Sequence, residues 1–419
     1  MDFMKEAISQ NRHWETNEVV IPRIDPPLIE REAFSVLEQS AQSKFVVILR
    51  GLRRVGKSVM ARQLLQKMML SGSKPSELCW FEFDRAMGTT TDDLDSLIKF
   101  FQSRGAKTII FDELAFVKGW QDIIKRYYDR TEIKLIVTGS SALELDRRSA
   151  ESLAGRFRLI AVKPFSFKEF LLLKGYSIPK TALELVDQAE NAIIKCNDYV
   201  HSGGLPEAVR MKAEERKSYV KDSLLNPLFF KDIPSVFPSA NPDLLLKTLE
   251  LLSATVGSTF QFQTLAQILG CTHPTVSAQV EILTRGLLAR PLFNHTGSLV
   301  KQKRTSKKIV ISDNAIVSTL NSEIRVGALA ENLVAETSEA EYFWRDAEGR
   351  EVDFIFPKKK LAIEVKYQNT ISSEDEKNLR YFIERRKGWK GILITKNDES
   401  KGDIPHVPLW KWLLGSRKA

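Results

Sequence analysis

The chain has 419 residues, 43% hydrophobic and 27% charged, which is typical of a soluble globular protein with about two to four domains. No run of about 18 apolar residues occurs, so no membrane span is expected, and the first residues lack the apolar core of a signal peptide. The formal net charge of +9 is compatible with a nucleic-acid partner.

Cysteine and histidine are sparse. The three cysteines, Cys79, Cys196 and Cys271, form no CxxC pair, and the five histidines are scattered along the chain. This usage indicates a reducing cytoplasm and argues against a zinc site built from His and Cys.

The first motif follows a predicted buried strand over residues 45–49. Residues 51–58 read GLRRVGKS, which matches the phosphate-loop pattern GxxxxGK[ST], and an apolar helical spacing follows. We expect Lys57 to reach the β- and γ-phosphates of ATP and Ser58 to ligate Mg²⁺. A chance match in a glycine-containing turn is the alternative. The predicted nucleotide-binding residues are Gly51, Leu52, Arg53, Arg54, Val55, Gly56, Lys57, Ser58, Val59, Thr138 and Ser140.

A second predicted strand, residues 108–111, ends in Asp112 and Glu113. Acids at the tip of a buried strand are costly unless they are used, and α/β sheets bind ligands at the C-terminal ends of their strands. The pattern predicts Asp112 as a Mg²⁺ ligand and Glu113 as the general base that polarises the attacking water. A helix-capping acid pair is the alternative, and it accounts for only one of the two residues.

Two further positions leave alternatives open. A third strand, residues 133–137, ends in Thr138-Gly139-Ser140-Ser141, where a hydroxyl can sense the γ-phosphate or cap the next helix. Arg156 can act as a catalytic arginine finger or form a structural salt bridge. With another strand near residues 77–85, the region from 40 to 165 alternates strand and helix, which predicts a parallel sheet.

Together with later strings, these motifs resemble those of the AAA-type P-loop ATPases of archaea and bacteria that carry a C-terminal, restriction-endonuclease-like domain of uncharacterised function. The strings are GLRRVGKS, IIFDE followed by VKGW, VTGSSA, LAGRF with PFSFKEFL, GGLPEAV, VGALAENLVAE, and EVDF with IEVK. They follow the family's order over nearly the whole chain. The resemblance implies ATP binding, ATP hydrolysis and a PD-(D/E)xK-like fold.

The expected fold class is therefore α/β, with a P-loop NTPase parallel-sheet core, a helical lid and winged helix, and a restriction-endonuclease-like α/β domain. The expected divisions are an N-terminal segment (1–40), the ATPase core (41–165), the helical lid or linker (166–240), the winged helix-turn-helix (241–304) and the nuclease-like domain (305–419).

The predicted helix-turn-helix places Gly270 at the turn and Thr272 as the N-cap of the second helix, before Pro274. The apolar face of that helix consists of Val276, Val280 and Leu283. The groove-facing positions would be His273, Thr275, Ser277 and Gln279, which are polar but include no Lys or Arg.

A basic run nearby can bind nucleic-acid phosphates. It consists of Lys301, Lys303, Arg304, Lys307 and Lys308. A winged helix used only for packing and a solvated charge run are the alternatives that stay open. If nucleic acid is the partner, DNA is favoured over RNA.

Near the C-terminus, residues 351–356 and 361–367 read as a hairpin in which residue 356 pairs with residue 361. Alternation sets Asp353 on the face away from Val352 and Phe354, directly across from Glu364. Carboxylates with Cβ atoms about 5 Å apart repel, so a hard cation, Mg²⁺ first, is expected between them.

Lys366 can orient or activate water there, and Glu331, on a predicted amphipathic helix upstream, can add a third carboxylate. This set resembles the metal site of PD-(D/E)xK nucleases, although Val352 replaces the family's proline. It implies Glu331, Asp353 and Glu364 as metal ligands and Asp353, Glu364 and Lys366 as catalytic residues. An ordinary amphipathic hairpin is the alternative.

Two functions remain open. One is an ATP-driven enzyme whose ATPase gates a Mg²⁺-dependent nuclease, and the other is an ATP-controlled binding or signalling switch that does not cleave. A simple metabolic kinase is disfavoured by the large C-terminal region. A homo-oligomer is required if Arg156 acts in a neighbour's site rather than its own.

Overall fold

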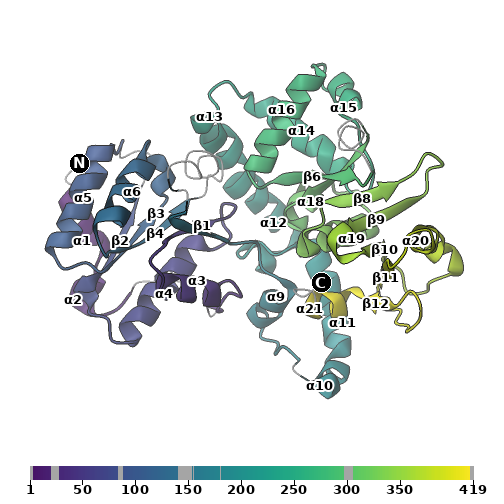
Figure 1. Ribbon diagram of the computed structural model, residues 1–419, viewed down its shortest axis with the longest axis horizontal. Helices are drawn as coiled ribbons and strands as arrows, with labels where there is room; N and C mark the ends of the chain where they lie inside the picture. Colours follow the sequence, from purple (N-terminus) through teal and green to yellow (C-terminus); the bar gives the residue numbers. More distant parts are fainter. Residues whose placement is uncertain are drawn as a thin grey trace. The chain divides into compact units, whose positions relative to one another are not determined.

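The computed structural model describes residues 3–19, 28–83, 88–139, 153, 155–179, 181–296 and 305–415. The chain divides into two compact units, Met1–Lys163 and Pro164–Ala419, each built on its own β-sheet (Figure 1). Predicted residues that lie outside the described ranges are Ser140, Ser141, Lys301, Lys303 and Arg304. Within the described ranges, no helix has the length and apolar character that a membrane crossing requires.

The first unit contains a five-stranded parallel sheet in the order β2-β3-β4-β1-β5. Its strands are β1 (Val46–Arg50), β2 (Leu78–Glu82), β3 (Thr108–Asp112), β4 (Lys134–Gly139) and β5 (Phe157–Ala161). The apolar runs VVIL of β1 and TIIF of β3 are buried throughout, as parallel strands covered on both faces require. The predicted parallel-sheet core is confirmed.

Helices cover both faces of this sheet. They are α1 (Phe3–Gln10), α2 (His13–Thr16), α3 (Phe34–Ala41), α4 (Lys57–Leu70), α5 (Thr91–Ser103) and α6 (Trp120–Arg130), with the short turns η1 (Pro75–Glu77) and η3 (Leu114–Phe116). On one face, α1, α5 and α6 pack over alternate strand residues that include Ile48, Phe81 and Phe111. The residues between them point to the other face, and α3 packs against β1, β5 and α4.

The N-terminal segment covers the edge strand β2 with side-chain hydrogen bonds. The Asn11 amide donates to the carbonyl of Trp80 and accepts from its N–H, both at 2.7 Å, and Gln10 accepts from the N–H of Glu82 at 2.7 Å. An uncovered edge strand presents unpaired backbone groups to other chains. The predicted N-terminal segment therefore covers the β2 edge of the first unit's sheet.

The second unit begins with helices and also contains a mixed sheet. Its helical elements are α9 (Phe167–Leu173), α10 (Ala182–Asp187), α11 (Ala189–Ser202), η4 (Ala208–Arg210), α12 (Ala213–Tyr219), η5 (Val220–Leu225), η6 (Leu228–Asp232), α13 (Ile233–Val236), α14 (Pro242–Ala254), α15 (Phe262–Ile268), α16 (His273–Arg285), α18 (Asn314–Leu320), α19 (Val326–Ser338), η7 (Pro357–Lys359), α20 (Ser373–Glu384) and α21 (Leu409–Gly415). Most of the described residues between 166 and 240 are helical, as their pattern predicted.

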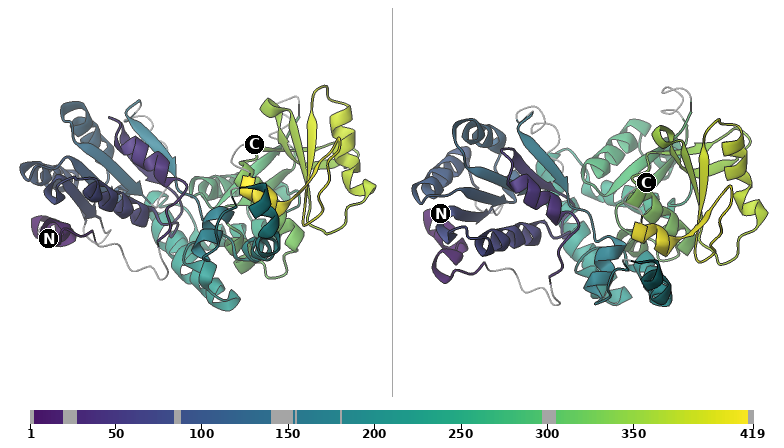
Figure 2. Two further views of the ribbon diagram at one scale, coloured as in Figure 1. Left: turned by 90° about the horizontal axis from the view of Figure 1, so that it is seen from below. Right: turned by 60° about the horizontal axis from the view of Figure 1, so that its bottom comes forward.

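The sheet of the second unit has seven strands in the order β12-β11-β10-β9-β8-β6-β7, and Figure 2 shows it from two further sides. They are β6 (Ala289–Asn294), β7 (Lys307–Ile311), β8 (Tyr342–Arg345), β9 (Glu351–Phe356), β10 (Leu361–Lys366), β11 (Lys390–Thr395) and β12 (His406–Pro408). Because β6 pairs with both β7 and β8, the sheet is continuous across the division expected at residue 304.

Helices α19 and α20 pack against this sheet. Near its β12 edge, the His406 imidazole lies between two carboxylates, with Nε2 at 2.7 Å from Glu376 and Nδ1 at 2.5 Å from Asp398. Burial alone disfavours the imidazolium, but the two carboxylates outweigh it and raise the pKa of His406. His406 thus ties β12 to α20.

The two helices predicted here are present as α15 and α16, and the antiparallel strands β6 and β7 follow them in the chain. Thr272 caps α16 by accepting from the N–H of Thr275, and Gly270 has a φ of +62°. The predicted apolar face of α16 is buried. One groove-facing assignment is wrong: Gln279 is buried and accepts a hydrogen bond from Thr248 of α14. Only a tertiary contact could show that this polar side chain points inward.

The two glycines of the GGLPEAV string pack closely against Phe165 and Asp313 within the second unit. A Cβ on Gly203, whose φ is +68°, would lie 1.9 Å from Asp313 Oδ1, and one on Gly204 would lie 2.2 Å from the carbonyl oxygen of Phe165. The Gly204 N–H donates to Asp313 at 2.7 Å, and burial raises the pKa of Asp313 to about 7. These glycines are required by close backbone approach and have a structural role.

Candidate nucleotide site and C-terminal carboxylate cluster

The phosphate loop lies between β1 and α4. Gly51 packs so closely that a Cβ there would lie 2.2 Å from the Val162 carbonyl oxygen. Gly56 has a φ of +91° and Arg54 a φ of +66°, so the loop uses left-handed backbone at two positions. The buried Lys57 ammonium donates to the carbonyl oxygens of Gly51 and Leu52 at 3.1 and 2.8 Å. The loop therefore folds around its own lysine.

Polar groups from the ends of β3 and β4 meet the start of α4. The buried Asp112 carboxylate accepts hydrogen bonds from the hydroxyls of Thr138 and Ser58. Burial, partly offset by Thr138, raises the pKa of Asp112 to about 6. Glu113 has a φ of +54°, and its N–H donates to Thr138 Oγ1 at 3.2 Å. The predicted residues Ser58, Asp112, Glu113 and Thr138 are therefore brought together.

This donor set fits Mg²⁺ and a nucleotide triphosphate. A hydroxyl and a carboxylate stand side by side at a helix N-terminus, which are oxygen ligands of the kind that Mg²⁺ takes in P-loop sites. Lys57 supplies the positive charge that a phosphate chain requires.

Arg31 was not predicted, because nothing in the sequence around it marks a site. Its guanidinium is buried and donates to the carbonyl oxygens of Val55 and Lys163, each at 2.7 Å. It thereby ties the phosphate loop to the segment that follows β5. Arg31 is a positioning residue for the loop, and only the folded structure shows it.

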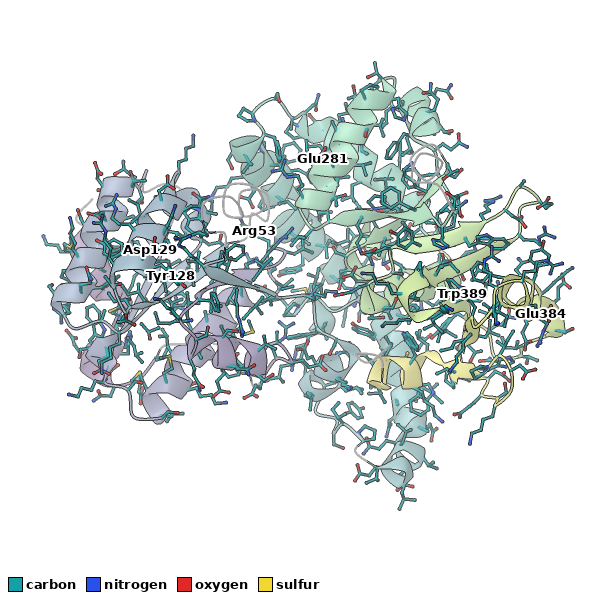
Figure 3. The ribbon with its side chains drawn as sticks, in the orientation of Figure 1. Arg53, Tyr128, Asp129, Glu281, Glu384 and Trp389 are labelled. Atoms are coloured by element: carbon teal, nitrogen blue, oxygen red, sulfur yellow. The ribbon has the colours of Figure 1, made fainter. Side chains whose placement is uncertain are left out.

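The structure does not bring Arg156 to this site. The Arg156 carbonyl oxygen accepts from the Val46 N–H at the start of β1, whereas the phosphate loop follows the end of β1. Five residues of strand span about 16 Å. The guanidinium pairs with Asp129 of α6 at 2.9 Å, and Figure 3 shows Asp129 apart from Arg53 of the phosphate loop. The structural salt bridge, one of the two alternatives, is therefore present, and the finger role stays a prediction.

The C-terminal hairpin has the predicted register over three pairs: 361 with 356, 362 with 355 and 363 with 354. The regular ladder then stops. Instead of a fourth pair, the Asp353 N–H donates to Glu364 Oε2 at 3.2 Å and the Val365 N–H donates to Asp353 Oδ2 at 2.9 Å. The expected alternation also fails, because a register irregularity between β8 and β9 places Val352 and Ile355 in one core. Asp353 and Glu364 are nevertheless adjacent.

The cation beside Asp353 is Lys308. Its ammonium, on a side chain that is 2% exposed, lies 2.8 Å from Glu331 Oε1, 2.6 Å from Glu351 Oε1 and 2.8 Å from Asp353 Oδ1. Burial opposes its charge, but Asp353, Glu331 and Glu351 outweigh it and raise the pKa of Lys308 well above its usual value. We call Glu331, Glu351, Asp353 and Glu364 the carboxylate cluster.

Lys366 neutralises the other end of the carboxylate cluster. Its ammonium lies 2.7 Å from Glu364 Oε1. Burial, reinforced by the nearby Asp353 charge, raises the pKa of Glu364 to about 8, and the same two causes raise the pKa of Glu331 to about 7. Lys308 and Lys366 instead hold the pKa of Asp353 below its usual value against the effect of burial.

The predicted Mg²⁺ site does not fit this arrangement, because the Lys308 ammonium takes the position among the carboxylates. In the part of the chain that the structure describes, no group of three or more His, Cys, Asp or Glu side chains is placed to hold a metal ion. The buried Lys308 is also unavailable to nucleic-acid phosphates. Lys307 is buried too, and its ammonium donates to the Thr305 carbonyl oxygen at 3.1 Å. The basic run predicted to bind phosphates therefore does not extend to these two lysines.

Comparison with protein families identifies the first unit. Residues 43–171 match the family model described as "AAA domain", a span that contains the phosphate loop, Asp112, Glu113 and Thr138. This match supports an AAA-type P-loop ATPase core over that span. Residues 194–326 and 326–412 match two models described as "Domain of unknown function", DUF8612 and DUF4143. A restriction-endonuclease-like C-terminal domain therefore stays a prediction.

Two proteins that are similar over most of this chain carry the description "Uncharacterized protein". One from Methanocaldococcus jannaschii is 26% identical over 94% of this chain and 89% of its own length. One from Haemophilus influenzae is 25% identical over 92% of this chain and 99% of its own length. The similarity to each protein therefore extends over most of both chains.

Two solved structures are similar at low sequence identity. A Walker-type ATPase of Pyrococcus abyssi has a TM-score of 0.42 at 16% identity and covers 70% of this chain and 96% of its own. The Aeropyrum pernix ORC1 protein, solved in complex with DNA, has a TM-score of 0.34 at 13% identity and covers 75% of this chain and 96% of its own. The function proposed below rests on neither.

Proposed function

We propose that this protein is a Mg²⁺-dependent ATP hydrolase whose nucleotide state controls a C-terminal domain that binds a partner without cleaving it. The observation that carries the ATPase part is the meeting of Lys57, Ser58, Asp112, Glu113 and Thr138 at one edge of a parallel sheet. These residues come from three segments far apart in the sequence, and each has a chemical role at a phosphate chain.

Each residue has a distinct task. Lys57 leaves the carbonyl oxygens of its own loop to contact the β- and γ-phosphates. Ser58 and Asp112 would hold Mg²⁺, which neutralises negative charge on the phosphates. Glu113 orients the attacking water and accepts its proton. Thr138, which bridges Asp112 and the Glu113 N–H, fixes the position of both acids.

ATP binding and turnover in Lys57→Ala and Ser58→Ala test the ATPase proposal. Lys67→Ala is the matched control, because Lys67 lies on the same helix α4 and pairs with Glu38 at 3.0 Å, away from the loop. We expect Lys57→Ala to lose ATP binding, Ser58→Ala to require more Mg²⁺ for turnover, and Lys67→Ala to behave as wild type. Normal ATP binding by a folded Lys57→Ala protein would contradict the proposal.

The non-cleaving role of the C-terminal domain is supported by Lys308, whose ammonium occupies the carboxylate cluster. A cleaving nuclease is the second candidate, and one observation favours it: Glu331, Asp353, Glu364 and Lys366 are brought together from α19, β9 and β10. Cleavage of plasmid, single-stranded DNA and RNA with Mg²⁺, with and without ATP, separates the two when wild type is compared with Asp353→Ala. Cleavage that depends on Asp353 would establish the nuclease.

DNA is the partner that we propose for the helix-turn-helix elements. The net charge of +9 and the exposed His273 at the start of α16 support it. DNA binding that weakens with rising salt and falls in His273→Ala is the expected result. Unchanged DNA binding in His273→Ala would show that DNA does not contact His273. The expected division of the chain also stays a proposal, except that the sheet of the second unit crosses its boundary at residue 304.

A further inference from the structure

The carboxylate cluster surrounds the ammonium group of Lys308. Lys308 lies on β7, while its three partners come from α19 and β9, so the ammonium joins elements that are not neighbours in sequence. Three carboxylate oxygens lie within 2.6–2.8 Å of one nitrogen, and an ammonium has three hydrogens to donate. Two of these contacts are hydrogen bonds, to Glu331 and Asp353, and Glu351 is a third ion-pair partner.

The two central carboxylates are satisfied by protein groups at every oxygen. Asp353 Oδ1 accepts from Lys308 and Oδ2 from the Val365 N–H. Glu364 Oε1 accepts from Lys366 and Oε2 from the Asp353 N–H. A metal ion entering this site would have to replace at least one of these donors and lie beside an ammonium of like charge, which a site of low dielectric constant strongly disfavours.

The position of Lys308 on strand β7 determines the direction of its side chain. Lys307, the preceding residue, forms a bridge with Phe260 and places its ammonium 4.9 Å from the Phe262 ring, outside the cluster. Successive residues of a strand point to opposite faces, so Lys308 is directed into the cluster by the backbone of β7. Lys307 is consequently a matched control of the same residue type on the same strand.

We infer that Lys308 is a built-in counterion that takes the place of a divalent metal ion in the carboxylate cluster and keeps such ions out. This inference deepens the proposed non-cleaving function and rests on it. The cluster then holds α19, β7, β9 and β10 together by charge, and the domain works as a binding module whose structure is independent of divalent cations.

Binding of Mn²⁺ to the nucleotide-free full chain tests the inference, with calorimetry or electron paramagnetic resonance as the readout. Wild type should show no Mn²⁺ site that depends on Asp353. Lys308→Ala should gain one, with a dissociation constant at least about tenfold lower than wild type, because the repelling ammonium is gone and the carboxylates remain. Lys307→Ala should gain none, and Lys308→Ala/Asp353→Asn should lose the gained site.

Two results would overturn the inference. One is a Mn²⁺ site in wild type that disappears in Asp353→Asn. The other is a Lys308→Ala protein that gains no Asp353-dependent site. If Lys308→Ala unfolds without metal, refolding by Mn²⁺ supports the inference and failure to refold counts against it. The assay contains neither ATP nor nucleic acid, so its failure is distinguishable from a failure of the proposed ATPase or of the DNA proposal.

Discussion

Replacing Asp112 by Asn should stabilise the nucleotide-free ATPase unit while it abolishes Mg²⁺-dependent hydrolysis. Burial raises the pKa of Asp112 from 3.8 to about 6. At about 1.36 kcal/mol per pKa unit, keeping this carboxylate ionised costs about 3 kcal/mol of folding free energy. The folded state binds this proton more tightly than the unfolded state does. Wild type therefore loses this stability as the pH rises from about 4 through about 6.

Urea unfolding of the full chain measures the effect, with hydrogen exchange of β3 peptides reporting the first unit. We expect Asp112→Asn to exceed wild type by about 3 kcal/mol near pH 8 and by about half of that near pH 5. Glu113→Gln is the control, since it removes a neighbouring acid that is only partly buried. An Asp112→Asn protein that is less stable than wild type, or a difference that does not change with pH, would refute this reasoning.

Three further predictions concern residues away from the phosphate loop. Arg156→Ala should leave both the melting temperature and ATP turnover of the isolated protomer unchanged, because its pair with Asp129 is exposed and lies at the end of the sheet opposite the phosphate loop. A loss of turnover at high dilution would contradict this prediction. Gly203→Ala should destabilise the second unit by about 2–4 kcal/mol in urea unfolding, because the new Cβ would clash with the Asp313 carboxylate and the residue would keep a positive φ. An unchanged free energy of unfolding would contradict this prediction. His406→Gln should lower the melting temperature most below pH 6.5, because the raised pKa of His406 gives the wild type stability that is lost as the pH rises through that pKa. A difference in melting temperature that grows with rising pH would contradict this prediction.

Local patterns were sufficient to predict which residues meet at the candidate nucleotide site. The phosphate loop depends on two glycines and a lysine at fixed spacing, and Asp112 and Glu113 follow a buried strand directly. Parallel strands bring their C-terminal ends to one edge, so a fold-class prediction already placed these residues together. Arg31 escaped prediction because its contacts are to backbone carbonyl oxygens 24 and 132 positions away.

The carboxylate cluster could be predicted only in part. The hairpin register brought Asp353 and Glu364 together correctly, because it depends on a local turn. Lys308 looked like one member of an exposed basic run, since its role depends on the packing of β7, α19 and β9, which local periodicity does not encode. Gln279 failed for the same reason: its partner, Thr248, lies on a different helix. Charge balance in a buried site requires the tertiary structure.

The most direct test of the account is ATP turnover by Glu113→Gln in the full chain with Mg²⁺, together with a measurement of the nucleotide that stays bound. The account predicts that the variant binds ATP as wild type does and hydrolyses it about 100-fold more slowly or less, because only the group that accepts the water's proton is removed. Hydrolysis at the wild-type rate by this variant would contradict it.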